Sequence, residues 1–437
     1  MNNIDTLING RWVVPIEPDT VVLDHHSVAV HQGRIVELLP ASEAAQKYRA
    51  HQTIELAHHA VIPGFVNAHT HAAMSLFRGL ADDLPLMEWL QKHIWPAEQK
   101  WAGAEFVRDG TELAVAEMIK SGTTCFNDMY FFPDESARVA SEAGIRACVG
   151  LIMIDFPSAW AQSAEEYLHK GLKVHDDFRN DALIRTVFAP HAPYTVSDAP
   201  LSKIRTLADE LDLPIHMHVH ETPHEVDESV ARFGVRPLER LAKLGFLTPR
   251  LLAVHMTQLL PGEIDVLHER GVNVIHCPES NMKLASGFCP VGQLVKKGVN
   301  VALGTDGAAS NNDLDMLDEL RMAALLAKGV ARDAVAVPAH TALQMATLNG
   351  AKALGLDDRI GSIVAGKQAD FVAIDLSAIT SQPVYDPISQ IVYSTGRDQI
   401  SDVWVNGKQL LKNRGLTTLD ETAVLEKAQR WSNKIKN

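Results

Sequence analysis

Two kinds of hydrophobic pattern alternate along the middle of the chain. Eight short runs rich in Val, Ile, Leu and Ala recur between residues 61 and 306, and each is followed by a stretch with helical spacing, such as residues 111–120 or 201–211. Nearly continuous apolar strands that alternate with helices are typical of a parallel sheet buried on both faces. The runs are AVIPGFVNAH, GTTCFND, IRACVGLIM, LIRTVFAPH, LPIHMHVHE, LLAVHM, VNVIHC and VNVALGTDG.

Eight such units predict an α/β fold, a closed (β/α)8 barrel of the TIM type over residues 61–355, since about 250 residues is the usual size of such a barrel. The flanks contain other short β-like runs, and Asn406-Gly407 is a hairpin signal. Neither flank has enough strands for a stable sheet alone. We therefore expect residues 1–60 and 356–437 to form one small composite β-sandwich domain, with a last helix over residues 420–436.

Composition narrows the class of protein. The chain has 437 residues, 46% of them hydrophobic, and its 40 basic and 54 acidic residues give a net charge of −14. A negative protein without a basic patch is not expected to bind nucleic acid. No apolar run approaches the roughly 18 residues of a membrane span, and the N-terminus does not resemble a signal peptide. We expect a cytoplasmic protein with no membrane partner, and a homo-oligomer is compatible with these data.

Polar residues end several of the apolar runs, and in a barrel of this kind such positions carry the functional side chains. His69 and His71 share one side of the first strand if side chains alternate, which suits a divalent metal, although hydrogen-bonded core histidines would give the same pattern. The convergence of several runs on one barrel mouth favours the metal. The others are the fifth run with His216, His218, His220 and Glu221, the sixth with His255 and the eighth with Asp306.

These motifs resemble the amidohydrolase superfamily over nearly the whole chain, through PGFVNAHTH, HVHE, His255 and GTDG. GSIVAGKQADFVAIDL resembles the segment that re-enters the composite sandwich of that superfamily. Within it, HTHAAMSLFRGLADDLPLMEWL, HCPESNMKLASG and GTDGAASNNDLDM resemble the 5′-methylthioadenosine/S-adenosylhomocysteine deaminases. The resemblance implies hydrolytic deamination of the adenine ring of 5′-methylthioadenosine, adenosine or S-adenosylhomocysteine, which yields an inosine-type product and ammonia.

The resemblance also implies roles for individual residues. The metal ligands would be His69, His71, His218 and Asp306. Glu221 would carry protons, His255 would orient the attacking hydroxide, and Asp306 would accept a proton. Strand alternation alone does not choose among the three histidines of the fifth run, and the His-x-x-Glu spacing of the family selects His218 with Glu221. His220 is then a structural or supporting residue, and His216 and His276 have no assigned role.

The resemblance further implies a nucleoside pocket and a single metal. Substrate would contact Trp89, His191, Glu221 and Glu98, the last through the ribose hydroxyls. Members with two metals bridge them with a modified lysine at the end of the fourth strand, and RTVFAPHAPY contains no lysine. One divalent ion per chain is therefore expected. Three histidines and an aspartate suit zinc, and iron(II) is also compatible.

Two alternatives use the same scaffold. One is another amidohydrolase that acts on guanine, cytosine, a triazine or a cyclic amide, because only Glu98, Trp89 and SNMKLASG favour a nucleoside. The other is a barrel without catalytic activity, against which the complete set of ligands and acids argues.

The residues after the third strand bear on the 5′ substituent of the substrate. Deaminases that accept S-adenosylhomocysteine place arginine near this loop, whereas residues 151–160 read LIMIDFPSAW and contain no cation. An unpaired buried carboxylate is costly, and apolar side chains suit a small thioether. We expect a preference for 5′-methylthioadenosine, unless Arg179, Arg185 or a partner subunit supplies the charge. The side chains expected to line this pocket are Leu151, Met153, Phe156 and Trp160.

Overall fold

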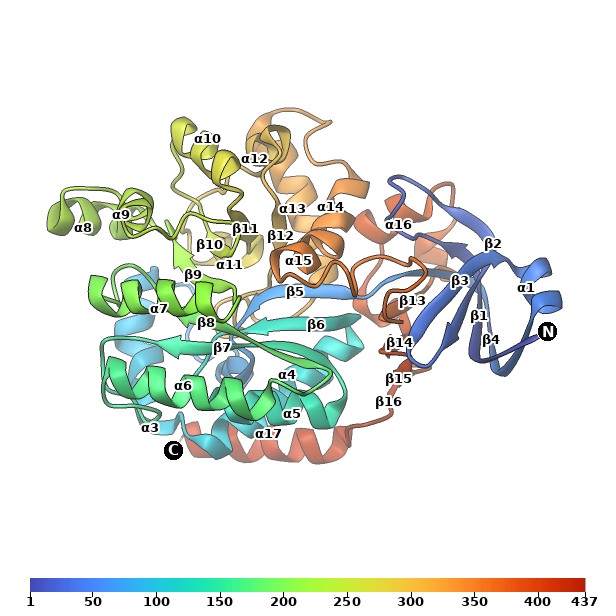
Figure 1. Cartoon of the computed structure of the whole chain (residues 1–437), viewed down its shortest axis with the longest axis horizontal. Helices are drawn as coiled ribbons and strands as arrows, with labels where there is room; N and C mark the ends of the chain where they lie inside the picture. Colours follow the sequence, from blue (N-terminus) through green and yellow to red (C-terminus); the bar gives the residue numbers. More distant parts are fainter. Residues whose placement is uncertain (437) are drawn as a thin grey trace.

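The computed structural model describes residues 1–436, which contain two eight-stranded sheets (Figure 1). One is the parallel sheet of the barrel, in which each strand pairs with the next in sequence order. All eight apolar runs form its strands, as predicted. They are β5 (Phe65–Thr70), β6 (Thr123–Asp128), β7 (Arg146–Met153), β8 (Ile184–Pro190), β9 (Ile215–Val219), β10 (Leu251–His255), β11 (Asn273–His276) and β12 (Val301–Leu303).

Side chains join the first and last strands of the barrel. Asn67 in β5 accepts a hydrogen bond from the backbone N–H of Thr305 at 3.1 Å and donates one to its hydroxyl at 2.7 Å. The backbone N–H of Asp306 donates to the carbonyl of His69 at 3.0 Å, and the Thr70 hydroxyl donates to the carbonyl of Asp306 at 2.9 Å. Residues that end strands therefore also close the barrel.

Helices follow the strands and surround the barrel (Figure 1). The segment between β5 and β6 is the longest and holds η1 (Ala72–Phe77), α2 (Leu86–Trp89), the π-helix η2 (Leu90–Ile94), α3 (Trp95–Trp101) and α4 (Ala104–Lys120). Single helices follow the next three strands: α5 (Pro133–Ala143), α6 (Ala164–Phe178) and α7 (Asp198–Glu210). The later ones are α8 (Pro223–Phe233), α9 (Pro237–Lys243), α10 (Pro261–Arg270), α11 (Pro278–Lys283), α12 (Val291–Lys297), α13 (Met316–Ala331), α14 (Ala339–Met345) and α15 (Leu348–Ala353).

The inside of the barrel is filled by small and branched apolar side chains. Val66, Val187, Val254 and Ile275 come from different strands and share one buried cluster with Leu354, which follows α15. Side chains after the last barrel helix thus pack into the same core as the strands. A TIM-type barrel is a packed core and not a pore, so its open end at the carboxyl ends of the strands is the place for a site.

The second sheet combines both ends of the chain, as predicted. Its strand order is β16-β15-β14-β13-β4-β1-β2-β3, and β1 and β4 pair in parallel. Its two longest strands, β1 and β4, carry polar residues at their exposed positions, so they are longer than their apolar runs. The strands are β1 (Asn2–Val13), β2 (Leu23–His31), β3 (Arg34–Pro40), β4 (Tyr48–Pro63), β13 (Phe371–Asp375), β14 (Ile400–Val405), β15 (Lys408–Lys412) and β16 (Gly415–Leu416).

A single residue connects the two sheets. β4 ends at Pro63 and β5 begins at Phe65, so the first apolar run of the sequence is shared between both sheets. A Cβ atom on the intervening Gly64 would lie 2.0 Å from the hydroxyl oxygen of Thr124. Only glycine allows this close approach of the connection to β6.

The remaining helices lie at or beyond the composite sheet: α1 (Ala41–Lys47), η3 (Ile379–Ser381), α16 (Pro387–Tyr393), η4 (Arg397–Gln399) and α17 (Glu421–Lys436). Although α17 follows this sheet in sequence, it packs on α4 of the barrel, where the Trp431 indole donates to Asp109 at 2.9 Å (Figure 1). Within residues 1–436, no helix combines the length and apolar character that crossing a membrane requires.

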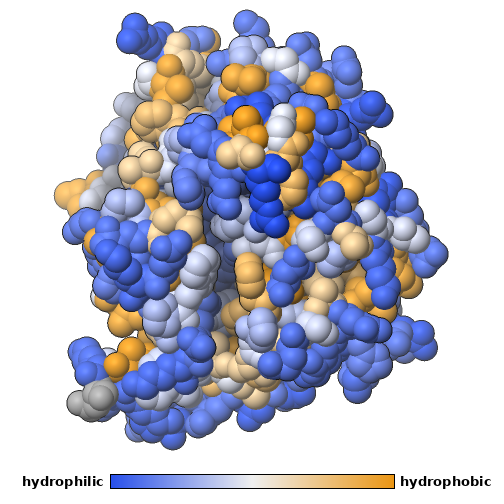
Figure 2. All heavy atoms as spheres, turned by 90° about the vertical axis from the view of Figure 1, so that its left-hand side faces the viewer, coloured by the Kyte–Doolittle hydropathy of each residue, from blue (hydrophilic) through white to orange (hydrophobic). Residues whose placement is uncertain are grey.

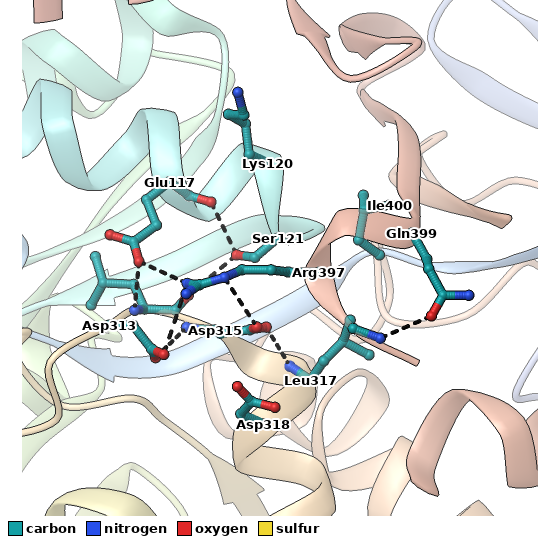
Figure 3. A network of polar contacts seen from close by, with 12 residues as sticks. Glu117, Lys120, Ser121, Asp313, Asp315, Leu317, Asp318, Arg397, Gln399 and Ile400 are labelled. Atoms are coloured by element: carbon teal, nitrogen blue, oxygen red, sulfur yellow. Dashed lines mark hydrogen bonds and ion pairs between the residues drawn. The ribbon is translucent and has the colours of Figure 1, made fainter. Parts of the chain in front are cut away.

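Two ionic contacts hold the composite sheet against the barrel. Arg146 of β7 and Asp370 are both buried, and their N–O distances are 3.0 and 3.2 Å. Arg397 of η4 lies 3.2 Å from Glu117 of α4 and 3.8 Å from each of Asp313 and Asp315, in the loop after β12 (Figure 3). The sheet therefore contacts the segment that continues from Asp306.

The buried ion pair gives a first prediction. Asp370→Ala leaves the Arg146 guanidinium without its partner inside the protein, which should lower the free energy of unfolding by about 3–5 kcal/mol. Asp358→Ala is the control, because the Asp358 side chain is 75% exposed and 3.9 Å from Arg359. Denaturant titration of both variants measures the effect. A loss for Asp370→Ala no larger than that of the control would contradict the importance of the pair.

Candidate active site

A cavity of about 650 Å³ opens at the carboxyl ends of the barrel strands. Figure 2 looks at this side of the molecule and shows a narrow hollow near the middle of the face. The cavity is large enough for a small organic ligand, whose pockets typically measure about 300–1,000 Å³. Eight of the site residues predicted from the sequence line it together: His71, Trp89, Glu98, His191, His218, Glu221, His255 and Asp306.

Three histidines and an aspartate converge beside the cavity. The Nε2 atoms of His69 and His71 are each 3.3 Å from Oδ1 of Asp306. The Nε2 atom of His218 is 3.3 Å from Nε2 of His69. Strand β5 ends at Thr70, so His71 comes to this point from the start of η1 and not by strand alternation.

The other ring nitrogen of each histidine is already engaged. Nδ1 of His71 donates to the carbonyl of Met129 at 2.6 Å, and Nδ1 of His218 donates to the carbonyl of His191 at 2.8 Å. Nδ1 of His69 is 2.8 Å from Nε2 of His216. A carbonyl only accepts hydrogen bonds, so the proton of the neutral ring is on Nδ1 and Nε2 offers a lone pair.

This donor set fits a divalent cation. Burial lowers the pKa of His218 well below its usual range and that of His69 to about 4, so both rings are neutral, and their facing Nε2 atoms can act as metal ligands. Burial also lowers the pKa of His71, but Asp306 outweighs it and raises the value to about 9. The site thus attracts positive charge, and three imidazoles with one carboxylate are a typical zinc ligand set.

Glu221 and His255 lie next to this cluster. Oε1 of Glu221 is 3.9 Å from Nε2 of His255, and burial raises the pKa of the Glu221 carboxyl. The His255 ring stacks on that of His218, with centroids 5.3 Å apart. A buried carboxyl with a raised pKa is suited to general acid-base chemistry.

Two supporting residues were missed in the sequence. The hydroxyl of Ser280 donates to Oδ2 of Asp306 at 2.7 Å, and Oδ1 of Asn281 accepts from Nδ1 of His255 at 2.8 Å. Both belong to α11, which begins directly after β11. They lie within HCPESNMKLASG, which resembles the deaminase family but gave no predicted role for these two residues. A helix that starts immediately after a barrel strand was the available signal.

Three residues at or near the histidine cluster have strained backbone conformations. His220, His255 and Asp306 have φ angles of 55°, 75° and 62°, in the left-handed region that non-glycine residues rarely adopt. Each such residue costs on the order of 1–3 kcal/mol and is kept where the surrounding structure requires it. The chain bends sharply at the ends of three barrel strands and so turns these side chains to their positions.

The residues expected to contact substrate also line the cavity. Trp89 is buried, and its indole N–H donates to the carbonyl of Ala81 at 3.1 Å. The π-turn of η2 separates Trp89 from Glu98, and both face the cavity. Burial raises the pKa of Glu98 to about 7, against the lowering effect of the nearby Tyr130 hydroxyl. Nδ1 of His191 is 3.0 Å from the Thr195 hydroxyl.

The expected apolar wall after the third strand needs a correction. Of the four side chains expected there, only Phe156 lines the cavity. Leu151 and Met153 are buried in the hydrophobic core, and the ring of Trp160 packs against that of Phe132, with centroids 5.2 Å apart. Side chains alternate along a strand, so the neighbouring Ile152 and Ile154 face the cavity instead.

Neither of the arginines considered in the sequence lies beside this apolar wall. Among residues 1–436, no lysine or arginine lines the cavity. Arg185 donates to the carbonyl of Gly355, and the Arg179 side chain is 63% exposed beside Asp176. The two arginines considered in the sequence therefore lie elsewhere.

The three unassigned histidines are buried outside the cavity lining. His220 accepts a hydrogen bond from the backbone N–H of Leu238 at 3.2 Å, through Nε2. His276 ends β11. His216 contacts His69 as described above.

Comparisons with known proteins agree with this geometry. The model of the family described as "Amidohydrolase family" matches residues 60–410. The chain is 51% identical over 432 residues to the 5-methylthioadenosine/S-adenosylhomocysteine deaminase of Teredinibacter turnerae, covering 99% of this chain and 98% of that one. It is 42% identical to the 5′-deoxyadenosine deaminase of Methanosarcina mazei, over 99% of this chain and 98% of that one. A crystal structure of an adenosine deaminase from Xanthomonas campestris with bound zinc superposes with a TM-score of 0.99 at 55% identity, covering 100% and 99% of the two chains.

Glu225 gives a prediction on pH. Its buried carboxyl accepts hydrogen bonds from the backbone N–H groups of His220 at 3.1 Å and Glu221 at 2.7 Å, and burial raises its pKa to about 8. In the unfolded chain a glutamate titrates near about 4.3. Between these pH values the unfolded state loses a proton that the folded state keeps, so this group lowers stability as pH rises.

The expected result is that Glu225→Gln gains stability relative to the wild type from pH 5 to pH 8, because glutamine has no proton to lose. Denaturant titrations at several pH values measure the difference. Glu228→Gln on the same helix is the control, since that side chain is 46% exposed. A difference between Glu225→Gln and wild type that does not change with pH would show that Glu225 ionises as an ordinary carboxyl does.

Proposed function

The chain belongs to the amidohydrolase family, whose model matches most of its length, and from this premise we propose that it is a zinc-dependent deaminase of 5′-methylthioadenosine and related adenosine derivatives. Relatives that share half of its residues over their full length carry deaminase names. The observation that carries the proposal is the cavity that joins Trp89 and Glu98 to the histidine cluster.

His69, His71, His218 and Asp306 hold one zinc ion in this proposal. The zinc in the related Xanthomonas campestris structure supports the choice of metal. When bound, a divalent ion supplies hydroxide at neutral pH, because it lowers the pKa of water to about 7. Strand β8 reads IRTVFAP and offers no lysine to bridge a second metal.

In this proposal Glu221 transfers protons and His255 positions the attacking hydroxide. Nδ1 of His255 donates to Asn281, so its Nε2 is free to accept a hydrogen bond from the attacking hydroxide and to hold it against C6 of the purine. Glu221 protonates N1 as the new C–O bond forms, and a proton is then passed to the amino group, which leaves as ammonia. Asp306, held by the Ser280 hydroxyl, accepts the proton released from water.

Other residues that line the cavity bind the nucleoside. Trp89 provides an apolar wall for the purine, and His191 offers its ring to the same molecule. An ionised Glu98 accepts hydrogen bonds from two neighbouring hydroxyls at once, which suits a ribose. These contacts favour a nucleoside over the bare bases, triazines or cyclic amides on which other hydrolases of this scaffold could act.

The 5′ substituent meets Ile152, Ile154 and Phe156. This apolar wall suits a methylthio group, because sulfur and methyl bury without polar partners. The amino acid end of S-adenosylhomocysteine brings a carboxylate that finds no cation among the described lining residues. Burial of such a group without a partner is costly, so S-adenosylhomocysteine is the poorest of the three substrates.

The proton carrier is tested by Glu221→Gln, which keeps the shape of the side chain but cannot exchange a proton. The variant should retain about one zinc ion per chain, because Glu221 is not one of the four ligands, while kcat falls by about 10² to 10⁴. Elemental analysis and steady-state kinetics measure the two quantities, with Glu228→Gln as the control. Near-normal kcat would assign proton transfer to another residue.

The substrate preference is tested by kcat/KM for 5′-methylthioadenosine, adenosine and S-adenosylhomocysteine under one set of conditions. We expect 5′-methylthioadenosine to exceed adenosine by about tenfold or more, as expected for a filled apolar pocket, with S-adenosylhomocysteine lowest. Ammonia release is the readout. Equal or better turnover of S-adenosylhomocysteine would refute the apolar-wall argument, and no ammonia from any of the three would refute the proposed function.

A further inference from the structure

His216 lies directly behind the histidine cluster. Its Nε2 atom is 2.8 Å from Nδ1 of His69, and the two ring centroids are 4.8 Å apart at 77°. The residue is fully buried in β9, two positions before His218. It does not line the cavity, so it can act on the site only through His69.

The geometry fixes which nitrogen carries each proton. Nε2 of His69 faces Asp306 and His218, so this is the atom that must be bare to bind a cation. The proton of His69 is then on Nδ1, and the N–H donates to Nε2 of His216. His216 must therefore accept, which requires its own proton to be on Nδ1.

The remaining N–H of His216, on Nδ1, is an argument against a purely packing role for this side chain. Its Nδ1 is buried and has no hydrogen-bond partner among residues 1–436. A buried donor without a partner carries a desolvation penalty that an apolar side chain would avoid. The chain carries this penalty at a position from which an acceptor lies 2.8 Å from His69 Nδ1.

Resting on the metal site of the proposed function, we propose that His216 is a positioning residue that fixes the tautomer and ring orientation of His69, so that its Nε2 points to the metal. A histidine accepts this hydrogen bond without bringing a further negative charge, unlike the carboxylates that often support metal-binding histidines. His71 and His218 obtain the same support from backbone carbonyls.

The test compares His216→Gln with His216→Met. Glutamine places an amide oxygen near the position of Nε2, whereas methionine has a similar length and shape but no comparable acceptor. We expect zinc affinity, measured by competition with a chelator, to fall about 10- to 100-fold in His216→Met and to stay within about threefold of wild type in His216→Gln. Zinc-saturated His216→Met should keep a normal KM, because the residue does not touch the cavity.

Two further variants make the comparison decisive. His216→Asn replaces methionine in this comparison if His216→Met folds poorly. Asparagine is one methylene shorter than glutamine, so its amide does not reach His69, and zinc binding should weaken as in the methionine variant. His276→Met is the matched control, since His276 is another buried strand histidine whose Nδ1 has no partner in the described chain. Thermal unfolding of the metal-free proteins checks that each variant is folded.

The outcomes separate this inference from the proposed function. Equal loss of affinity in the glutamine and methionine variants, or wild-type affinity in both, would overturn the role of His216. Wild-type protein that binds zinc but deaminates none of the nucleosides would overturn the proposed function alone, and the affinities would still decide the role of His216. Wild-type protein that holds no zinc would overturn both.

Discussion

The closure of the barrel between its first and last strands is the constraint on which the site depends. The Asn67 side chain holds Thr305, and the next peptide group, that of Asp306, donates to the carbonyl of His69. Once these bonds form, the carboxylate of Asp306 must lie beside the two imidazoles that follow Asn67 in sequence. The positive φ of Asp306 is tolerated because these bonds over-determine its backbone. The contacts between the first and last barrel strands thus bring these donor atoms together before any ligand binds.

Burial then sets the electrostatics of the cavity. Glu98 and Glu221 line the cavity and have raised pKa values, and in both the main cause is removal from water. No lysine or arginine of residues 1–436 lines the cavity to offset them. A divalent ion at the histidine cluster would therefore supply the positive charge of the site, and the same lack of side-chain cations makes the wall near Phe156 suitable for an uncharged substituent.

The repeating apolar pattern was sufficient to predict the strands of the barrel, but not the individual residues whose positions depend on side-chain alternation or on distant contacts. Eight apolar runs predicted eight strands, and polar residues at their ends predicted which side chains would meet. The wall residues were shifted by one position, because alternation decides between Leu151 and Ile152 and a continuous apolar run does not show its phase. Ser280, Asn281 and His216 act through contacts with residues distant in sequence, which no local pattern encodes. The roles of the predicted ligands and acids remain predictions, of which Glu221→Gln tests the proton carrier.

The composite sheet contributes to the site although it lies outside the barrel. The loop after β12 is held at its start by Asn67 and at its end by Arg397, which contacts Asp313 and Asp315 from the composite sheet side (Figure 3). Asp315 in turn caps α13 through the backbone N–H of Leu317 at 2.9 Å. A loop that is fixed at both ends loses its conformational entropy when the chain folds, so this entropy is not lost again when substrate binds. Through Arg397, the C-terminal part of the chain therefore restrains the far end of the loop that begins near Asp306.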